Sequence, residues 1–325
     1  AFGRINSSIE AANAEMDTER ADLLRVRRNL LEETAITYAL VRAGGERIEI
    51  ARQNVAEHGR LLAQIQRRVE GQLASSADER LATARLAQAR AHLGRSISEW
   101  EGAREELISL TQVATSAEEP IPMGLLGLGE STDLLDRAMV HNADILLKKQ
   151  QIDEAEAQLD QAKTQSMPTI YLQAGRFYDQ PGLQDTNQIS VVFEASLEGM
   201  GFADRGLRGE AAANRMAATQ DLAATRVRLK QELDSLQRNR RLQTDLIELQ
   251  TQSLIELESL LASYQRQYES GTKSWLDVLN IQREMFEQRR QLVQARHDWV
   301  VYSLKLQGKI GGLDRLAEMP ESFDG

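Results

Sequence analysis

The sequence predicts a mainly α-helical protein with a small β part, built from long coiled-coil helical hairpins. Only 5 Pro and 21 Gly interrupt the 325 residues, and aromatic residues make up 5%, a composition that favours long helices. Over two long stretches, apolar residues recur every three or four positions, a period close to 3.5. One shorter stretch alternates apolar and polar residues, which predicts strands.

Two long helices are predicted, over about 5–70 and 204–270. Their seam positions are Ile48, Ala51, Val55, His58, Leu62, Ile65 and Val69 in the first, and Leu254, Leu257, Leu261, Tyr264 and Tyr268 in the second. At about 1.5 Å per residue, each helix would be on the order of 100 Å long.

The two halves of the chain also repeat one another: the stretch from about Phe2 to Leu110 resembles the stretch from about Phe202 to Leu313. The segment RVRRNLLEET at 25–34 matches RVRLKQELDS at 226–235 with an offset of 201 residues. Gly71 matches Gly271 with an offset of 200, and Leu93 matches Leu292 with an offset of 199. Small insertions or deletions account for the drift, so we interpret the halves as two copies of one unit.

Each long helix is followed by a tight turn and a return helix, which we expect to end near 113 and 311. The turns read VEGQLASSADERL at 69–81 and YESGTKSWLDVL at 268–279, with Gly near the end of each long helix. Ser76 with Glu79 or Ser75 with Asp78 in the first turn, and Ser274 with Asp277 in the second, have the spacing of a capping box. Each copy is therefore predicted to be an αα-hairpin.

The segment between the two copies belongs to neither repeat and has a different pattern. A linker at 114–130 precedes an amphipathic helix over 131–165 that we expect to break near His141 and Asn142. Two strands of about 12 residues follow, at 168–179 and 187–198, separated by the turn-rich QPGLQDT. They predict a β-hairpin.

One face of the second strand is apolar and the other is mostly polar. The apolar face comprises Ile189, Val191, Phe193, Ala195 and Leu197. The strand length matches the ~9–11 residues that a tilted strand needs to cross a bilayer, so we expect this face to meet lipid. A soluble hairpin is the alternative, but an isolated two-stranded hairpin is not stable, and its edges need strands from elsewhere.

Composition excludes several function classes. The net charge of −10 disfavours nucleic acid as a partner, and the absence of Cys removes thiol catalysis and thiolate metal sites. No run approaches the roughly 20 apolar residues of a membrane-spanning helix. The four His, at 58, 92, 141 and 297, form no metal-binding motif, and the glycines form no nucleotide-binding loop. We expect no enzyme activity, catalytic residue, cofactor or metal.

The chain resembles the outer-membrane efflux protein family, the TolC-like exit ducts. The second tip has the family pattern Y-x-x-G-T-x-(S/T)-x-x-D-(V/L)-L, from Tyr268 and Gly271 to Asp277 and Leu279. PTIYLQAG and ISVVFEASLEGMGFADRG occupy the positions of the family's third and fourth strands. The sequence starts at the end of the second strand of the family, so we expect a fragment or a processed chain.

The resemblance implies an α-barrel of helical hairpins across the periplasm, with strands that contribute to a trimeric transmembrane β-barrel. It implies the following segments: a first hairpin repeat at 1–113 with its tip near 70–78, a linker with equatorial-type helices at 114–166, a transmembrane β-hairpin at 167–198, a second hairpin repeat at 199–313 with its tip near 269–277, and a C-terminal tail at 314–325.

Site roles are implied in the same way. Tyr268, Lys273, Asp277 and Asp78 become candidates for the periplasmic gate, although Asn280 and Lys273 depart from the family's Asp and Arg. Capping of the helix by Ser274 and Asp277 is the alternative role. The candidates for contact with a periplasmic adaptor are the tip residues Gly71, Gln72, Leu73, Ala74, Ser75, Gly271, Thr272, Ser274 and Trp275. An exposed Trp275 suits this contact, and burial of Trp275 beneath the turn is equally compatible with the sequence.

The expected function is that of a trimeric outer-membrane channel with a periplasmic helical tunnel. It would serve a tripartite export machine through an adaptor (membrane fusion protein) and, indirectly, an inner-membrane ABC or other transporter. We favour type I secretion of a protein, such as a large adhesin, over multidrug or small-molecule efflux. The alternative class is a soluble coiled-coil scaffold or adaptor protein, which has no need of strands with an apolar face.

Overall fold

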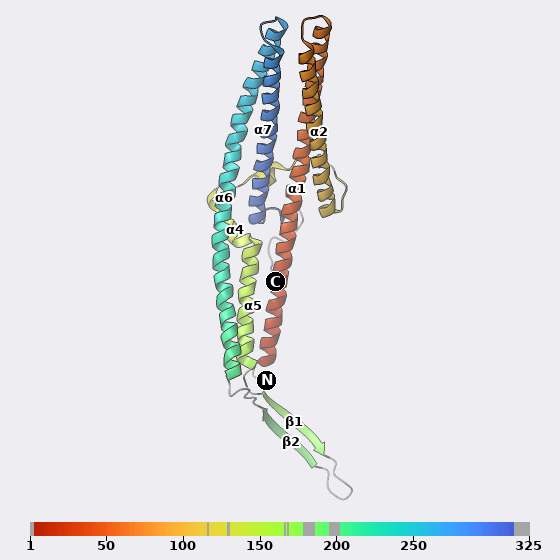
Figure 1. Ribbon diagram of the computed structural model, residues 1–325. Helices are drawn as coiled ribbons and strands as arrows, with labels where there is room; N and C mark the ends of the chain where they lie inside the picture. Colours follow the sequence, from red (N-terminus) through yellow and green to blue (C-terminus); the bar gives the residue numbers. More distant parts are fainter. Residues whose placement is uncertain are drawn as a thin grey trace. The chain divides into compact units, whose positions relative to one another are not determined.

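The computed structural model describes residues 3–115, 117–128, 131–165, 167, 169–177, 186–194 and 202–314. Its contacts divide the chain into two units, residues 1–27 with 135–231 and residues 28–134 with 232–325. The elements are α1 (Arg4–Glu70), α2 (Ser76–Thr111), α3 (Met123–Leu126), α4 (Ser131–His141), α5 (Ala143–Gln165), β1 (Thr169–Phe177), β2 (Thr186–Glu194), α6 (Phe202–Glu269) and α7 (Trp275–Lys309) (Figure 1).

The mainly helical fold with a small β part is confirmed. α1 and α6 run for 67 and 68 residues, with ends close to those expected from the heptad pattern. The expected break near 141 separates α4 from α5, because the Asn142 side-chain oxygen accepts hydrogen bonds from the backbone N–H groups of Asp144 and Ile145. The short helix α3, inside the segment expected to be a linker, was not predicted.

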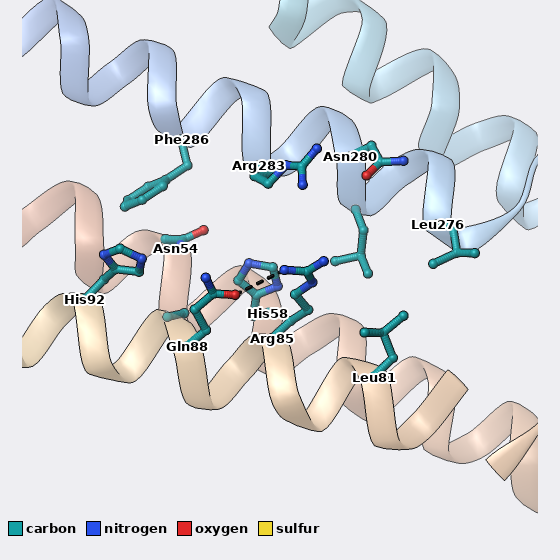
Figure 2. A pocket seen from close by; sticks show the side chains of 12 residues that line it. Asn54, His58, Leu81, Arg85, Gln88, His92, Leu276, Asn280, Arg283 and Phe286 are labelled. Atoms are coloured by element: carbon teal, nitrogen blue, oxygen red, sulfur yellow. Dashed lines mark hydrogen bonds between the residues drawn. The ribbon is translucent and has the colours of Figure 1, made fainter. Parts of the chain in front are cut away.

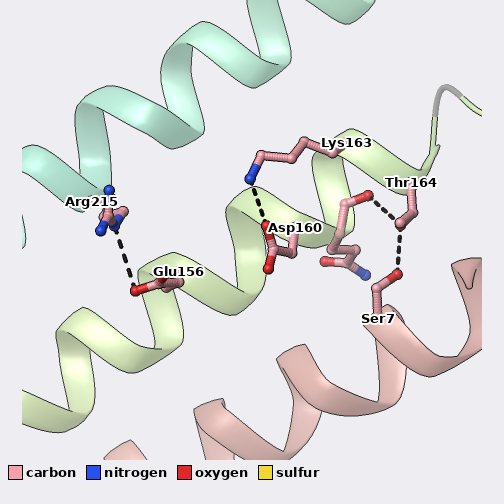
Figure 3. Close-up of polar contacts among 7 residues, drawn as sticks. Ser7, Glu156, Asp160, Lys163, Thr164 and Arg215 are labelled. Atoms are coloured by element: carbon pink, nitrogen blue, oxygen red, sulfur yellow. Dashed lines mark hydrogen bonds and ion pairs between the residues drawn. The ribbon is translucent and has the colours of Figure 1, made fainter.

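In the first unit, polar side chains connect α5 to its neighbours (Figure 3). The Ser7 hydroxyl of α1 lies 2.6 Å from the Thr164 hydroxyl of α5. The Arg4 guanidinium donates to the carbonyl oxygens of Gln165 and Met167 at 2.7 and 2.8 Å. On the side toward α6, Arg215 lies 3.6 Å from Glu156. These contacts hold both long helices against α5 at the end where the strands leave the helices.

The two strands form an antiparallel hairpin of nine residues each. Leu172 pairs with Val191 and Ile170 with Phe193, so the apolar positions of both strands share one face. Val191 is 71% exposed and Ile189 76% exposed. The apolar face expected from the sequence is therefore present over the described strands. Ala195 and Leu197 lie outside the described residues.

The second unit is held together by apolar seams between the two helical hairpins. Near the tips, one cluster joins α1 to the start of α7, and it contains Leu61, Ile65, Ala82, Trp275 and Leu279. Farther along, Leu304 and Leu313 pack with Ala39 of α1 and Leu126 of α3. The Arg240 guanidinium covers the Trp299 ring at 4.7 Å and donates to the Leu126 carbonyl, which fastens α3 against α7.

The turn after α7 is anchored by a buried ion pair. The Arg28 guanidinium donates to Asp314 at 2.5 and 3.1 Å, and both side chains are almost fully buried. The last described residue is therefore fixed to α1. The rest of the expected tail, residues 315–325, lies outside the described residues. Among the helices that the structure describes, none combines the length and hydropathy of a membrane span.

Candidate functional site at the hairpin tips

The two tip turns have the same backbone structure with a constant offset of 199 residues. The N–H of Leu73 bonds to the carbonyl of Arg68, as the N–H of Thr272 bonds to that of Gln267. The left-handed position is Gln72 (φ 58°) in the first turn and Gly271 (φ 78°) in the second. The alignment of Gly71 with Gly271 was therefore wrong by one residue, because the turn needs its left-handed residue at position 72.

Both return helices begin with a full capping box. Ser75 accepts a hydrogen bond from the N–H of Asp78, whose carboxylate accepts from the N–H of Ser75, and Ser274 and Asp277 repeat this arrangement. The Ser75 hydroxyl also donates to Asp78 at 2.8 Å. These hydrogen bonds, from side chain and backbone of the serine, hold the pKa of each aspartate below its usual range. The Ser76–Glu79 alternative is not used.

One hydrogen bond joins the tips of the two hairpins. The indole N–H of Trp275 donates to the Asp78 carboxylate at 2.9 Å. Trp275 is only 8% exposed and packs in one apolar cluster with Leu61 and Ile65. Of the two alternatives for Trp275, the structure shows burial beneath the turn.

Near the tips, two cationic side chains each lie over a tyrosine ring. The Arg68 guanidinium lies 4.8 Å from the centre of the Tyr268 ring, and this contact also joins the two hairpins. The Lys273 ammonium lies 4.6 Å from the centre of the Tyr264 ring, within the second hairpin. Among the described residues, neither Lys273 nor Tyr268 bonds to Asp78. The structure thus brings all four gate candidates to the tips but gives Asp78 a different partner, Trp275.

The ends of both turns are open to solvent. Leu73 is 72% exposed. The other candidates for adaptor contact that are exposed are Gly71, Gln72, Ser75, Gly271, Thr272 and Ser274, whereas Ala74 is half-buried. These turn residues therefore remain available to a partner, whereas Trp275 is buried.

Sequence reasoning missed a groove between the hairpins, below the tips. α2 and α7 face one another across a pocket of about 90 Å³, with His58 and Asn54 of α1 at its base (Figure 2). Arg85 and Arg283 point into it from the two sides. Burial, and to a lesser degree the charge of Arg85, lowers the pKa of His58. The heptad position of His58 showed that it would pack, but the opposing wall from α7 lies more than 200 residues away in sequence.

A second pocket, of about 410 Å³, continues the groove away from the tips. The two pockets share His92 and Phe286, whose rings meet edge to face at 6.1 Å. Within the described residues, no group of three or more His, Asp or Glu side chains is arranged to hold a metal ion. The site consists of packed tips above an arginine-lined groove.

Comparisons with known proteins agree with this architecture. The family model described as outer membrane efflux protein matches residues 134–312. The outer membrane protein TolC of Vibrio cholerae is 22% identical over 324 residues, which cover 95% of this chain and 74% of that protein. The solvent efflux pump outer membrane protein SrpC of Pseudomonas putida is 23% identical over 332 residues, which cover 96% and 68%.

Solved structures share the fold. A membrane protein from Pseudomonas aeruginosa superposes with a TM-score of 0.82 at 18% identity, covering 95% of this chain and 72% of that one. The outer membrane protein VceC of Vibrio cholerae superposes with a TM-score of 0.81 at 19% identity, covering 95% and 76%. At such low identity these structures support the fold alone.

Proposed function

Because the chain belongs to the outer membrane efflux protein family, we propose that it is the exit duct of a tripartite export machine. The family consists of outer-membrane transport channels rather than enzymes, and family membership argues against a soluble scaffold or adaptor. The observation that carries the proposal is the pair of helical hairpins with matching tips, joined through a β-hairpin with an exposed apolar face.

The channel is a homotrimer in this proposal. Two strands cannot satisfy their own edges in a membrane, so strands from other copies or from other parts of the protein must pair with β1 and β2. The apolar face around Leu172 and Val191 then meets outer-membrane lipid. The helices provide the periplasmic tunnel.

The hairpin tips form the periplasmic entrance. Tyr268, Lys273, Asp277 and Asp78 hold the entrance closed at rest, through contacts that are individually weak because they are partly exposed. The exposed turn residues meet a periplasmic adaptor, and they are Gly71, Gln72, Leu73, Ser75, Gly271, Thr272 and Ser274. Since an adaptor that binds the open form better shifts the equilibrium toward it, weak closing contacts suit a regulated entrance.

Planar-bilayer conductance of the assembled trimer tests the entrance. Tyr268→Phe with Lys273→Ser should raise single-channel conductance, and Asp277→Ala should reduce block by multivalent cations if the aspartates form a ring. Arg266→Ser is the matched control, because it removes one exposed cation of α6 outside the turn. Unchanged conductance in a correctly assembled double variant would show that these residues only cap and pack the tips.

For the cargo we favour a secreted protein such as a large adhesin, exported by a type I system. The support is the similarity of the tips to those of secretion-linked members. The alternative cargo is a small molecule, which the names of two relatives favour: a solvent efflux pump protein and a toluene efflux pump protein of Pseudomonas putida.

Deletion of the gene separates the two cargoes. Loss of one secreted protein, with unchanged tolerance of solvents and antibiotics, supports type I secretion. Lower tolerance with an unchanged set of secreted proteins contradicts it and assigns small-molecule efflux. Complementation with the intact gene is the control.

A further inference from the structure

We propose that the larger pocket of the groove binds a phosphate or diphosphate group through Arg47, Arg95 and Arg290. The pocket encloses about 410 Å³ between α1, α2 and α7, which is within the usual size of small-ligand sites. The inference is independent of the channel function, because ligand binding is measured directly.

Each of the three helices contributes one guanidinium to the pocket. Arg47 comes from α1, Arg95 from α2 and Arg290 from α7. A guanidinium presents parallel N–H groups that match two oxygens of one phosphate, so three of them can surround the oxygens of a single group. Glu99 is the one carboxylate among the residues found to line the pocket. The lining is therefore cationic, although the whole chain has a net charge of −10.

Neutral groups hold two of these arginines in place. Arg47 donates to the side-chain oxygen of Gln294 at 2.7 Å, and Arg95 lies 2.9 Å from Nδ1 of His92. Within the described part of the chain, neither arginine has a carboxylate within 4.0 Å. Their charges are thus positioned but not neutralised, as an anion site requires.

The third arginine has only a weak acidic partner. Arg290 lies 3.5 Å from Glu287 of the same helix, and both side chains are about half exposed. An exposed ion pair at this distance contributes little free energy. The Arg290 guanidinium can therefore leave Glu287 and turn toward a ligand at small cost.

The pKa of His92 is consistent with a positive electrostatic potential inside the groove. Its pKa is lowered by burial first and then by the charges of Arg95 and Arg290, while Glu287 acts in the opposite direction. The imidazole is therefore neutral at pH 7, and its Nδ1 can accept the hydrogen bond from Arg95. Phosphate oxygens in the pocket would offset the same charges that lower this pKa.

Calorimetric titration of the full-length protein in detergent tests the proposal. Inorganic pyrophosphate and glycerol 3-phosphate are the probes, at constant ionic strength set with chloride. The first represents a free diphosphate, and the second represents the phosphomonoester of a lipid headgroup. We expect saturable binding of at least one probe, and the tighter probe identifies the source of the phosphate.

Matched variants locate the binding. Arg95→Gln with Arg290→Gln should weaken binding by about tenfold or more, because two charge-assisted contacts are lost. Arg52→Gln with Arg80→Gln removes the same charge from exposed positions of α1 and α2 outside the pocket, and should change the affinity by less than about twofold. Arg95→Lys with Arg290→Lys should retain intermediate affinity, which guards against a folding defect in the Gln variant.

Two results would overturn the inference. One is the absence of saturable binding of either phosphate probe. If an acidic helical peptide binds in the same titration while neither phosphate probe does, the groove is assigned to a protein partner and the inference is equally overturned. The other is equal weakening by the two Gln variants, because binding would then follow the overall charge and not the pocket.

Discussion

The indole N–H of Trp275 on α7 donates to the carboxylate of Asp78 on α2 at 2.9 Å and joins the two hairpin tips of one chain. Asp78 also accepts the hydrogen bonds of the capping box at the start of α2. One carboxylate therefore fixes both the first turn of a helix and the contact between hairpins. A substitution at either residue should therefore change the local stability of both tips.

Trp275→Phe should loosen the contact between tips without emptying the core beneath them. The smaller ring keeps the packing on Leu61 and Ile65 but loses the hydrogen bond to the Asp78 carboxylate, and a hydrogen bond to a charged group contributes about 1.5–3 kcal/mol. Hydrogen exchange measured by mass spectrometry should become faster at 68–78 and 268–277. Trp275→Ala should cost more, about 3–5 kcal/mol, because a cavity is left. Identical exchange in the Phe variant and the parent would show that the hydrogen bond contributes nothing.

The tip should be insensitive to pH except in strong acid. The pKa values of Asp78 and Asp277 are lowered in the folded protein by the hydrogen bonds of their capping boxes. Stability from a lowered carboxyl pKa is present above the unfolded value of about 4 and is lost as the pH falls through the folded value. Exchange at the tips should therefore be unchanged from pH 7 to pH 5, after correction for intrinsic rates, and rise below about pH 4.

Asp78→Asn is the control for this pH dependence. The amide does not titrate, so the acid-induced increase in exchange at the first tip should shrink in the variant. An increase of the same size in variant and parent would assign the acid response to other carboxyl groups.

The adjacent glycines of α1 should respond in opposite directions to alanine. A methyl group at Gly44 would lie 2.9 Å from Cδ1 of Trp100, whereas a methyl group at Gly45 would meet nothing within 4 Å. Gly45→Ala should stabilise the helix by about 0.5–1 kcal/mol. Gly44→Ala should destabilise the protein by about 1–3 kcal/mol, because Trp100 has to move. Thermal unfolding of both variants checks the sign, and stabilisation by both would contradict the close packing.

The long helices and the tip caps were predictable from sequence because their causes are local. A heptad period fixes which face of α1 or α6 is buried, and Ser75 with Asp78 or Ser274 with Asp277 are three residues apart. The break at Asn142 was predictable for the same reason.

Contacts between hairpins were not predictable in the same way. The Trp275–Asp78 bond spans 197 residues, and the exposed and buried alternatives for Trp275 have the same local sequence. The left-handed Gln72 was also missed, because glycine is the usual residue there and Gly71 stands next to it. The groove arginines follow no motif, since they converge only when three helices are packed.

The buried pair of Arg28 and Asp314 should couple strongly in a double-mutant cycle. Asp314→Leu alone leaves a buried guanidinium without its carboxylate, and should cost about 3–5 kcal/mol. Arg28→Met with Asp314→Leu removes both charges and should cost much less than the sum of the single changes. Chemical unfolding of the four proteins gives the coupling energy. Additive effects would show that the two residues contribute independently.

The two faces of β2 should differ sharply in their tolerance of charge. Val191 lies on the exposed apolar face, opposite Leu172, while Ser190 lies on the other face, opposite Gln173. If the apolar face meets lipid, Val191→Arg places a charge in the hydrocarbon and should cost roughly 2–4 kcal/mol near the midplane. Ser190→Arg should cost far less, because its face lines the aqueous lumen in the proposed channel.

Assembly in lipid vesicles measures this difference, as the fraction of protein that becomes resistant to protease. Leu172→Arg is the internal check: it should behave like Val191→Arg, since the two residues are paired on the same face. Reduced assembly for Val191→Arg and Leu172→Arg but not for Ser190→Arg is the expected pattern. Equal assembly of all three variants would mean that neither face contacts lipid, and the hairpin would then require a different partner for its apolar side chains.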